Sequence, residues 1–157
     1  MKKFIVLGCS LLLGMSLYAQ DNKNMETKLK ENAEYQGAEA HKKHYQVIYQ
    51  LDSNNPDIIK KAIRNINNLL NDPRLKGKVE VELITFSGGT EALLKTSAFE
   101  TQIKDLINKG VQVAQCSNSL QERNLTKEQM FDFIGYVPSG NGELVIRGSE
   151  GWTIVKP

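Results

Sequence analysis

Two strand-like segments separated by a helix-like segment constrain the fold of this chain more than any other feature. Residues 45–51 (YQVIYQL) and 79–86 (VEVELITF) are rich in β-branched and aromatic residues, which is typical of strands. Between them, apolar residues recur at helical spacing over residues 59–70, after Asn55 and Pro56, two residue types favoured at a helix start. A strand–helix–strand order predicts parallel strands joined by a crossover helix.

The rest of the domain repeats this alternation. The expected elements are, in order, a turn at 87–90, a short helix around 92–94, a helix with a Ser97/Glu100 capping box that ends at Gly110, a strand at 111–115, a short helix with a Ser119/Glu122 capping box, a turn capped by Thr126, a strand at 133–137, a helix near 142–147 and a strand at 152–155. This pattern predicts an α/β fold with three layers, in which helices cover both faces of a mostly parallel five-stranded sheet.

The first segment has the features of a secretory signal peptide. Met1-Lys2-Lys3 is positively charged, residues 4–17 are largely apolar, and a small residue, Ala19, precedes a polar stretch. The apolar run is shorter than the roughly 20 residues that a membrane-spanning helix needs. A lipid anchor on Cys9 is the other alternative, but the apolar run before Cys9 is short. We therefore expect cleavage after Ala19 and a periplasmic or secreted protein with no membrane contact after cleavage.

Removal of residues 1–19 changes the charge and the cysteine count. It takes away two of the 20 Lys and Arg residues and none of the 18 Asp and Glu residues, so the mature chain has no net charge and no case for nucleic-acid binding. One cysteine remains, Cys116, which cannot form an intramolecular disulfide. Residues 20–44 are polar and predict a flexible or partly helical lead-in, and the folded domain is expected over 45–157.

Other candidate cofactor sites have simpler explanations. Gly88, Gly89 and Thr90 could approach a phosphate, but they match no nucleotide-binding motif and are more typical of a tight turn. Trp152 and Tyr136 are expected in the core or at a subunit contact. We expect no cofactor.

Candidate metal and acid–base residues are equally sparse. His41 and His44 could share one helical face, but they lack a third ligand and are expected to be solvated, so no metal is predicted. Glu80 and Glu82 fall on one face of a strand, which we expect to be a solvated or edge face.

Cys116 directly follows the expected strand 111–115, and ligands of open α/β sheets bind at the carboxyl ends of the strands. By position alone, a chemically used thiol and a small buried inert residue are about equally supported.

Four sequence runs together resemble the DsrE/DsrF-like sulfur-relay family. They are 111–125 (VQVAQCSNSLQERNL), 136–140 (YVPSG), 150–152 (EGW) and the terminal Lys-Pro, and the small single-cysteine branch of the family is the most similar. The resemblance covers residues 45–157. It implies an α/β/α fold, assembly into homo- or hetero-oligomers, and a cysteine that accepts sulfane sulfur as a persulfide and passes it to a partner protein.

The family cysteine matches Cys116. A helix that begins just after it would supply positive potential that favours the thiolate. Backbone N–H groups of Ser117 and Asn118 could hold a persulfide, and Arg123 could add charge. Relatives often have Arg-Gly where this chain has Arg123-Asn124, and Asn tolerates the left-handed conformation that such a turn needs.

These residues favour an exported, homo-oligomeric sulfur carrier or sulfurtransferase whose donor and acceptor are unknown. The alternative is a non-catalytic oligomeric binding module that keeps the fold. A redox role through an intermolecular disulfide of Cys116 is a third hypothesis.

Overall fold

The computed structural model describes residues 23–157, and the chain divides into two compact units, Met1–Glu39 and Ala40–Pro157. In the first unit, residues 23–34 form a helix with no buried residue, so part of the expected lead-in is helical. The expected signal segment and Cys9 lie outside the described residues. Within residues 23–157, no helix combines the length and the apolar character needed to cross a membrane.

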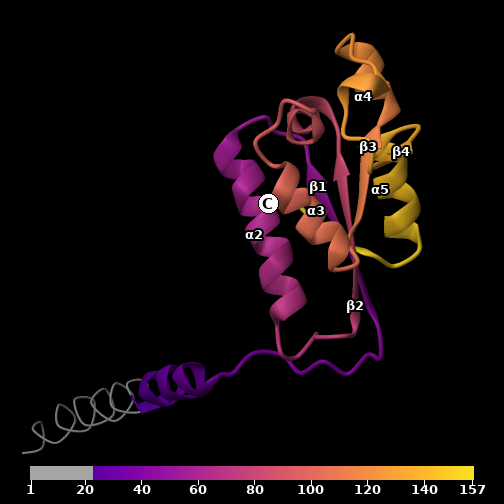
Figure 1. Cartoon of the computed structure of the whole chain (residues 1–157). Coiled ribbons are helices and arrows are strands. Elements are labelled where there is room, and N and C mark those ends of the chain that lie inside the picture. The colour runs from indigo at the N-terminus through magenta and orange to yellow at the C-terminus, as the bar shows by residue number, and fades with distance from the viewer. Residues whose placement is uncertain (1–22) are drawn as a thin grey trace, which may run out of the picture. The chain divides into compact units, whose positions relative to one another are not determined.

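The second unit contains a five-stranded sheet in which every neighbouring pair of strands is parallel, with the order β4-β3-β2-β1-β5 (Figure 1). The strands are β1 (Tyr45–Leu51), β2 (Val79–Thr85), β3 (Gln112–Cys116), β4 (Gly135–Val137) and β5 (Thr153–Val155). The mostly parallel sheet expected from the sequence is thus confirmed. The order places β2 in the middle and leaves the short strands β4 and β5 at the two edges.

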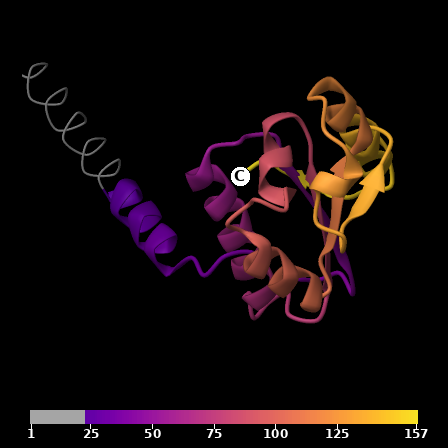
Figure 2. The same cartoon turned by 45° about the horizontal axis from the view of Figure 1, so that its top comes forward.

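Helices cover both faces of this sheet, which confirms the three layers (Figures 1 and 2). The elements on one face are α2 (Pro56–Asn71), the 3₁₀ helix η1 (Ser87–Leu93) and α3 (Glu100–Asn108). α5 (Gly140–Ser149) covers the other face. α4 (Ser117–Glu122) and the 3₁₀ helix η2 (Lys127–Gln129) lie beyond the carboxyl end of β3.

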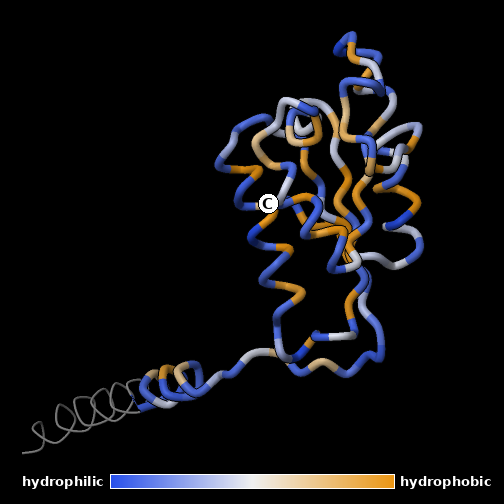
Figure 3. The backbone as a smooth tube through the Cα atoms, in the orientation of Figure 1, coloured by the Kyte–Doolittle hydropathy of each residue, from blue (hydrophilic) through white to orange (hydrophobic). Residues whose placement is uncertain are grey.

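The alternation of side chains along the strands divides the core into two clusters. The larger one joins α2, α3 and η1 to residues such as Val47, Leu83 and Val113. The smaller one consists of Ile48, Ile84, Ala114 and Trp152, with Leu144 of α5 packed against it. Figure 3 shows apolar stretches along the strands, and apolar and hydrophilic stretches that alternate along α2. α5 therefore covers the second face of the sheet, and polar residues also contribute to the packing on that face.

Several helix starts differ from expectation. Phe99 is the N-cap of α3 and Cys116 that of α4, and neither makes a side-chain capping bond, so the capping boxes expected from Ser97 and Ser119 are wrong. The Ser97 hydroxyl instead accepts from the N–H of Phe99 (3.3 Å), and the hydroxyl of Ser119 accepts from the N–H of Ser87 (2.9 Å). The turn expected at 87–90 is part of η1. Thr126 is the N-cap of η2, as expected, and its N–H donates to the side chain of Gln129 (2.8 Å).

Close packing explains the glycine pair after β2. A Cβ on Gly89 would overlap the carbonyl oxygen of Leu51, and one on Gly88 would lie 2.9 Å from the backbone nitrogen of Asn54. Because the backbone after β1 fills the space beside these glycines, their small size serves the packing of η1 onto β1.

Candidate functional site

Cys116 is the last residue of β3 and also the N-cap of α4, with φ −68° and ψ 119°. The cysteine is free and 4% exposed, yet neither of the two core clusters includes it. It therefore lies at the rim of the sheet, where β3 gives way to a helix, as the sequence suggested.

The neighbours of Cys116 come from β4 and from the end of β2. Val137 of β4 lies opposite Cys116 in the parallel register. The pair before it on β2 and β3 is Thr85 and Gln115, so the next residue, Phe86, follows on the β2 side. The residue after Val137, Pro138, accepts a hydrogen bond from the N–H of Asn118 in α4 (3.2 Å). This contact ties the start of α4 to the strand that pairs with Cys116.

A buried polar network holds the backbone at the cysteine. The side chain of Gln115, which is fully buried, donates to the carbonyl oxygen of Cys116 (2.9 Å) and to the hydroxyl of Thr90 (3.0 Å). Its amide oxygen accepts from the hydroxyl of Thr85 (2.7 Å). Because these bonds join β2, β3 and η1, the network fixes the junction between β3 and α4. The sequence analysis missed it, although a Gln at an inward position of a buried strand was a signal.

Of the other residues expected near the thiol, Ser117 is the first residue of α4, and Asn118 and Arg123 have partners of their own. Arg123 donates to the carboxylate of Glu91 in η1, and its Nε is buried without a partner. Asn118 uses its N–H for Pro138. Asn124 has φ +52°, which confirms the left-handed turn expected at this position. Arg123 thus joins the loop after α4 to η1.

The first turn of α5 follows directly on the strand beside the cysteine. Ser139 caps this helix by accepting from the N–H of Gly142 (3.2 Å). A Cβ on Gly140 would lie 2.7 Å from the ring of Phe86, so the helix start rests on that ring. The N-terminal ends of α4 and α5 therefore both follow from the Cys116–Val137 pair, and helix N-termini favour negative charge.

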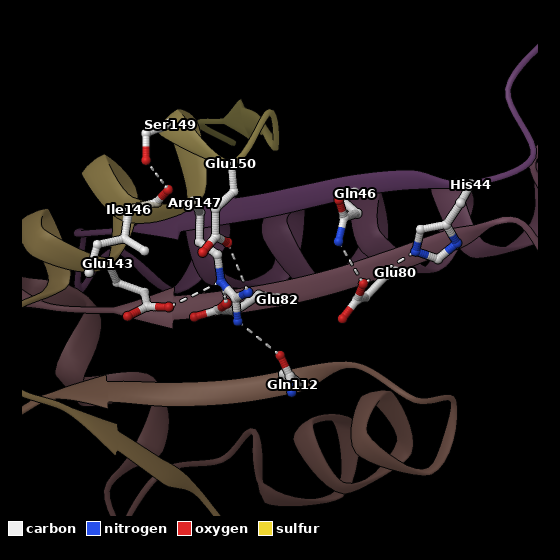
Figure 4. Close-up of polar contacts among 10 residues, drawn as sticks. All are labelled: His44, Gln46, Glu80, Glu82, Gln112, Glu143, Ile146, Arg147, Ser149 and Glu150. Atoms are coloured by element: carbon white, nitrogen blue, oxygen red, sulfur yellow. Dashed lines mark hydrogen bonds and ion pairs between the residues drawn. The ribbon is translucent and has the colours of Figure 1, made fainter.

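A second polar cluster surrounds Arg147 on the α5 side of the sheet (Figure 4). Its Nε donates to Glu82 of β2 (2.8 Å) and lies 3.1 Å from a carboxylate oxygen of Glu143. Its other nitrogens reach Glu150 (3.5 Å) and the side-chain oxygen of Gln112 (3.3 Å). Three carboxylates therefore share one guanidinium.

Glu82 departs from the expected solvated or edge face, because its side chain is only 3% exposed. Burial raises the pKa of Glu82, and the charge of Arg147 partly offsets this rise. The guanidinium also stacks over the ring of Trp152 at 4.2 Å. The sequence analysis missed Arg147, because nothing in its local pattern points to a strand 65 residues away.

An open pocket of about 450 Å³ is lined by members of this cluster and by residues of β3 and β4. We call it the edge pocket. It is lined by Glu82, Ile107, Val111, Gln112, Val113, Ala114, Phe133, Gly135, Tyr136, Val137, Glu143 and Arg147. Val137 also pairs with Cys116, so the pocket and the thiol share one strand.

The two histidines do not share a helical face, since residues 35–44 are not helical. His44 lies 3.2 Å from a carboxylate oxygen of Glu80, which also accepts from Gln46 (3.0 Å; Figure 4). The Gln46 hydrogen bond and, second to it, that of His44 lower the pKa of Glu80. Among the described residues, no group of three or more His, Cys, Asp or Glu side chains is placed to hold a metal ion.

Comparison with known proteins agrees with this architecture. A protein of unknown function, MTH1491, from Methanobacterium thermoautotrophicum has a solved structure that is 27% identical, with a TM-score of 0.68, and the match covers 72% of this chain and 99% of that one. A conserved protein of unknown function, BT1422, from Bacteroides thetaiotaomicron is 12% identical with a TM-score of 0.57, over 71% of this chain and 94% of that one, and shows the fold alone. No curated protein is significantly similar. The DsrE/DsrF-like family profile matches residues 45–157, which is the sheet with all its covering helices, and the chain belongs to this family.

Proposed function

We propose that this protein is an exported sulfur carrier of the DsrE type, which holds sulfane sulfur as a persulfide on Cys116. The observation that carries the proposal is the position of the free Cys116 thiol at the end of β3, as the N-cap of α4, in a chain of this family. Amide groups at helix N-termini favour the anionic forms of a thiol or persulfide over their neutral forms.

The proposed step is a sulfur transfer without net oxidation. The Cys116 thiolate attacks the outer sulfur of a polysulfide or of a donor persulfide. A new S–S bond forms on Cys116 while the S–S bond within the donor breaks, and the electron pair of that bond leaves with the shortened polysulfide or the donor thiolate. Attack of an acceptor thiolate on the outer sulfur reverses the step and restores Cys116.

The burial of Cys116 adds a condition to this chemistry. At 4% exposure the sulfur cannot meet a protein donor unless the junction of β3 and α4 opens locally. α4 is only six residues long, so we expect the opening to involve this helix rather than the sheet.

Intact-protein mass spectrometry after incubation with polysulfide tests the proposal. We expect the mass of one added sulfur atom in the wild-type chain, its removal by a thiol reductant, and no addition in Cys116→Ser. A chain that takes up no sulfur while native, across a range of donor concentrations, would rule the carrier function out.

The burial of Cys116 also favours a second candidate function, a binding module that keeps the family fold without thiol chemistry. Alkylation by iodoacetamide separates the two. A thiol that is wholly blocked in the native chain, together with full reaction in urea, supports the binding module. Alkylation of the native chain without global unfolding shows the local opening that the carrier needs, and supports the carrier.

Export is part of the proposal and rests on the sequence of residues 1–19. When the full-length chain is expressed in a bacterial host, we expect the protein recovered outside the cytoplasm to begin at Gln20. N-terminal sequencing of the periplasmic fraction tests this. A chain that keeps Met1 and stays in the cytoplasm contradicts it.

A further inference from the structure

The edge pocket lies where the sheet is incomplete. β3 begins at Gln112, but its pairing with β4 begins only at Ala114, opposite Gly135. Gln112 and Val113 therefore have strand partners in β2 and none in β4. A Cβ on Gly135 would lie 3.4 Å from the carbonyl oxygen of Val113, so this carbonyl is directed at β4 and is covered by Gly135. The N–H of Val113 is on the same side of the strand but precedes the first β3–β4 pair, and this part of the sheet edge faces the pocket.

The two walls of the pocket differ in chemistry because they belong to opposite faces of the sheet. The wall on the α3 side is apolar and contains Ile107, Val111, Val113 and Phe133. The wall on the α5 side contains Glu82, Gln112, Glu143 and Arg147. An extended chain laid along the edge of β3 would send consecutive side chains to opposite faces, and so to opposite walls.

The charges of the residues in each wall determine which kind of ligand side chain that wall can bind. On the α5 side, Arg147 already bonds to Glu82, Glu143 and Glu150, so one positive charge faces three negative ones. A further basic group is favoured there. On the α3 side, the ring of Phe133 lies under Lys104, with Nζ 5.0 Å from the ring centre, so a second cation is disfavoured and an apolar side chain fits.

We propose that the edge pocket is a docking site for an extended segment of a partner protein in which an apolar residue is followed by Lys or Arg. The apolar side chain lies against Ile107 and Phe133, and the basic one reaches Glu143. The backbone of the segment continues the sheet beside Val113 in the manner of β-augmentation. This docking goes beyond the sulfur chemistry and needs no thiol.

The test uses a fluorescein-labelled, end-blocked hexapeptide of alternating valine and lysine, and measures its binding to the purified chain by fluorescence anisotropy. The matched peptides replace lysine with glutamate, or carry N-methylated backbone nitrogens. We expect the lysine peptide to bind at least ~5-fold more tightly than either, because one loses the charge match and the other the backbone hydrogen bonds. Cys116→Ser should bind the peptide as the wild type does.

Glu143 of α5 and Glu150, the C-cap residue of the same helix, provide matched variants. Both pair with Arg147, but only Glu143 lines the pocket. Glu143→Gln should weaken binding of the lysine peptide by ~5-fold or more, and Glu150→Gln by less than ~2-fold. Amide NMR signals of Val113 and Gly135 should shift on binding in the wild type. Thermal unfolding of both variants checks that each is folded.

Other occupants give different results, and each contradicts the proposal. Equal binding of the lysine and glutamate peptides, or equal loss in the two variants, shows that Glu143 does not select the ligand. Binding of n-butylamine as tight as that of the peptide indicates a small-molecule site. Dissociation of a dimer by the peptide indicates that a second copy of this chain fills the pocket.

Discussion

At the scale of single residues, the pairing of Glu82 with Arg147 is the most consequential feature of the α5 face. Glu82 stands in the central strand with 3% of its side chain exposed, and Arg147 supplies its compensating charge. Removing one partner of a buried ion pair leaves the other charge in a medium that solvates it poorly. The stability of this face therefore depends on both residues together.

We predict that Arg147→Met lowers the free energy of unfolding by about 3 kcal/mol at neutral pH, measured by urea denaturation. The methionine keeps an apolar stem against Trp152 but leaves Glu82 unpaired. The double variant Glu82→Gln/Arg147→Met should recover a large part of the loss. A loss of the same size in the double variant would show that packing, and not the unpaired carboxylate, is responsible.

The same variant should have a distinctive dependence on pH. Burial raises the pKa of Glu82 above its ordinary value of 4.5, and without Arg147 nothing comparable opposes the rise. The folded state then holds a proton that the unfolded chain has released, so stability is lost as the pH rises from 4.5 through the raised pKa. The deficit of Arg147→Met should thus be smaller at pH 5 than at pH 7. A constant deficit would contradict this assignment.

What the sequence could predict about single residues depended on whether their environment is local. The left-handed conformation of Asn124 is a property of the residue and its turn, and it was predicted correctly. The burial of Glu82 depends on the central position of β2 and on Arg147 from α5. A strand pattern shows which residues share a face, but it does not show what covers that face.

At the scale of elements, the start of α5 depends on a glycine. A Cβ on Gly140 would lie 2.7 to 3.1 Å from three atoms of Phe86, whereas one on Gly148 would meet only the Cδ1 of Ile154, at 3.4 Å. Neither glycine has a positive φ. The two positions thus share a helix and differ in the space available to a side chain.

We predict that Gly140→Ala lowers the free energy of unfolding by about 1–3 kcal/mol, as overpacking does. Gly148→Ala should change it by less than 1 kcal/mol or raise it, because alanine favours the helix by up to about 1 kcal/mol. Urea denaturation of both variants measures the difference. Equal effects would mean that the ring of Phe86 moves aside without cost.

The junction of β3 and α4 makes a separate prediction. Gln115→Leu removes one hydrogen-bond partner each from Thr85, Thr90 and the Cys116 carbonyl oxygen, and should lower the free energy of unfolding by about 2–4 kcal/mol. Because the network holds the junction closed, alkylation of Cys116 should also become faster in the native state. Gln102→Leu, at an exposed position of α3, is the control and should alter neither quantity appreciably. Faster alkylation in both variants would remove the network from this role.

Element order was predictable and helix starts were less so, for one physical reason. Hydrophobic periodicity extends over a whole strand or helix, so the order of strands and helices followed from the sequence. In the sequence, Ser119 has the spacing of an ordinary helix cap. In the fold, its hydroxyl instead accepts a hydrogen bond from the N–H of Ser87. The cysteine at the strand end was found because strand ends are defined by the same periodicity, whereas the surrounding network joins distant segments.

At the scale of the whole molecule, the family profile begins only after the first unit has ended. It matches residues 45–157, while the lead-in helix at 23–34 has no buried residue. An isolated helix of this length is marginally stable in water. Deletion of residues 20–39 should therefore shift the thermal midpoint of the domain by less than ~3 °C, measured by circular dichroism. A larger fall would show that the lead-in packs on the domain.

The exposed apolar residues of α5 and β5 bear on the homo-oligomer that the family resemblance implies. Val145, Ile146 and Ile154 are 72%, 53% and 46% exposed, and exposed apolar groups of this kind commonly mark contacts between subunits. If the chain is a homo-oligomer through this surface, Val145→Lys should lower the mass measured by light scattering toward that of a monomer. Met25→Lys, which changes an apolar residue that is 58% exposed on the lead-in helix, should leave the mass unchanged. Loss of the oligomer in Met25→Lys alone would assign assembly to the lead-in, and an unchanged mass in both variants would place the contact on another surface.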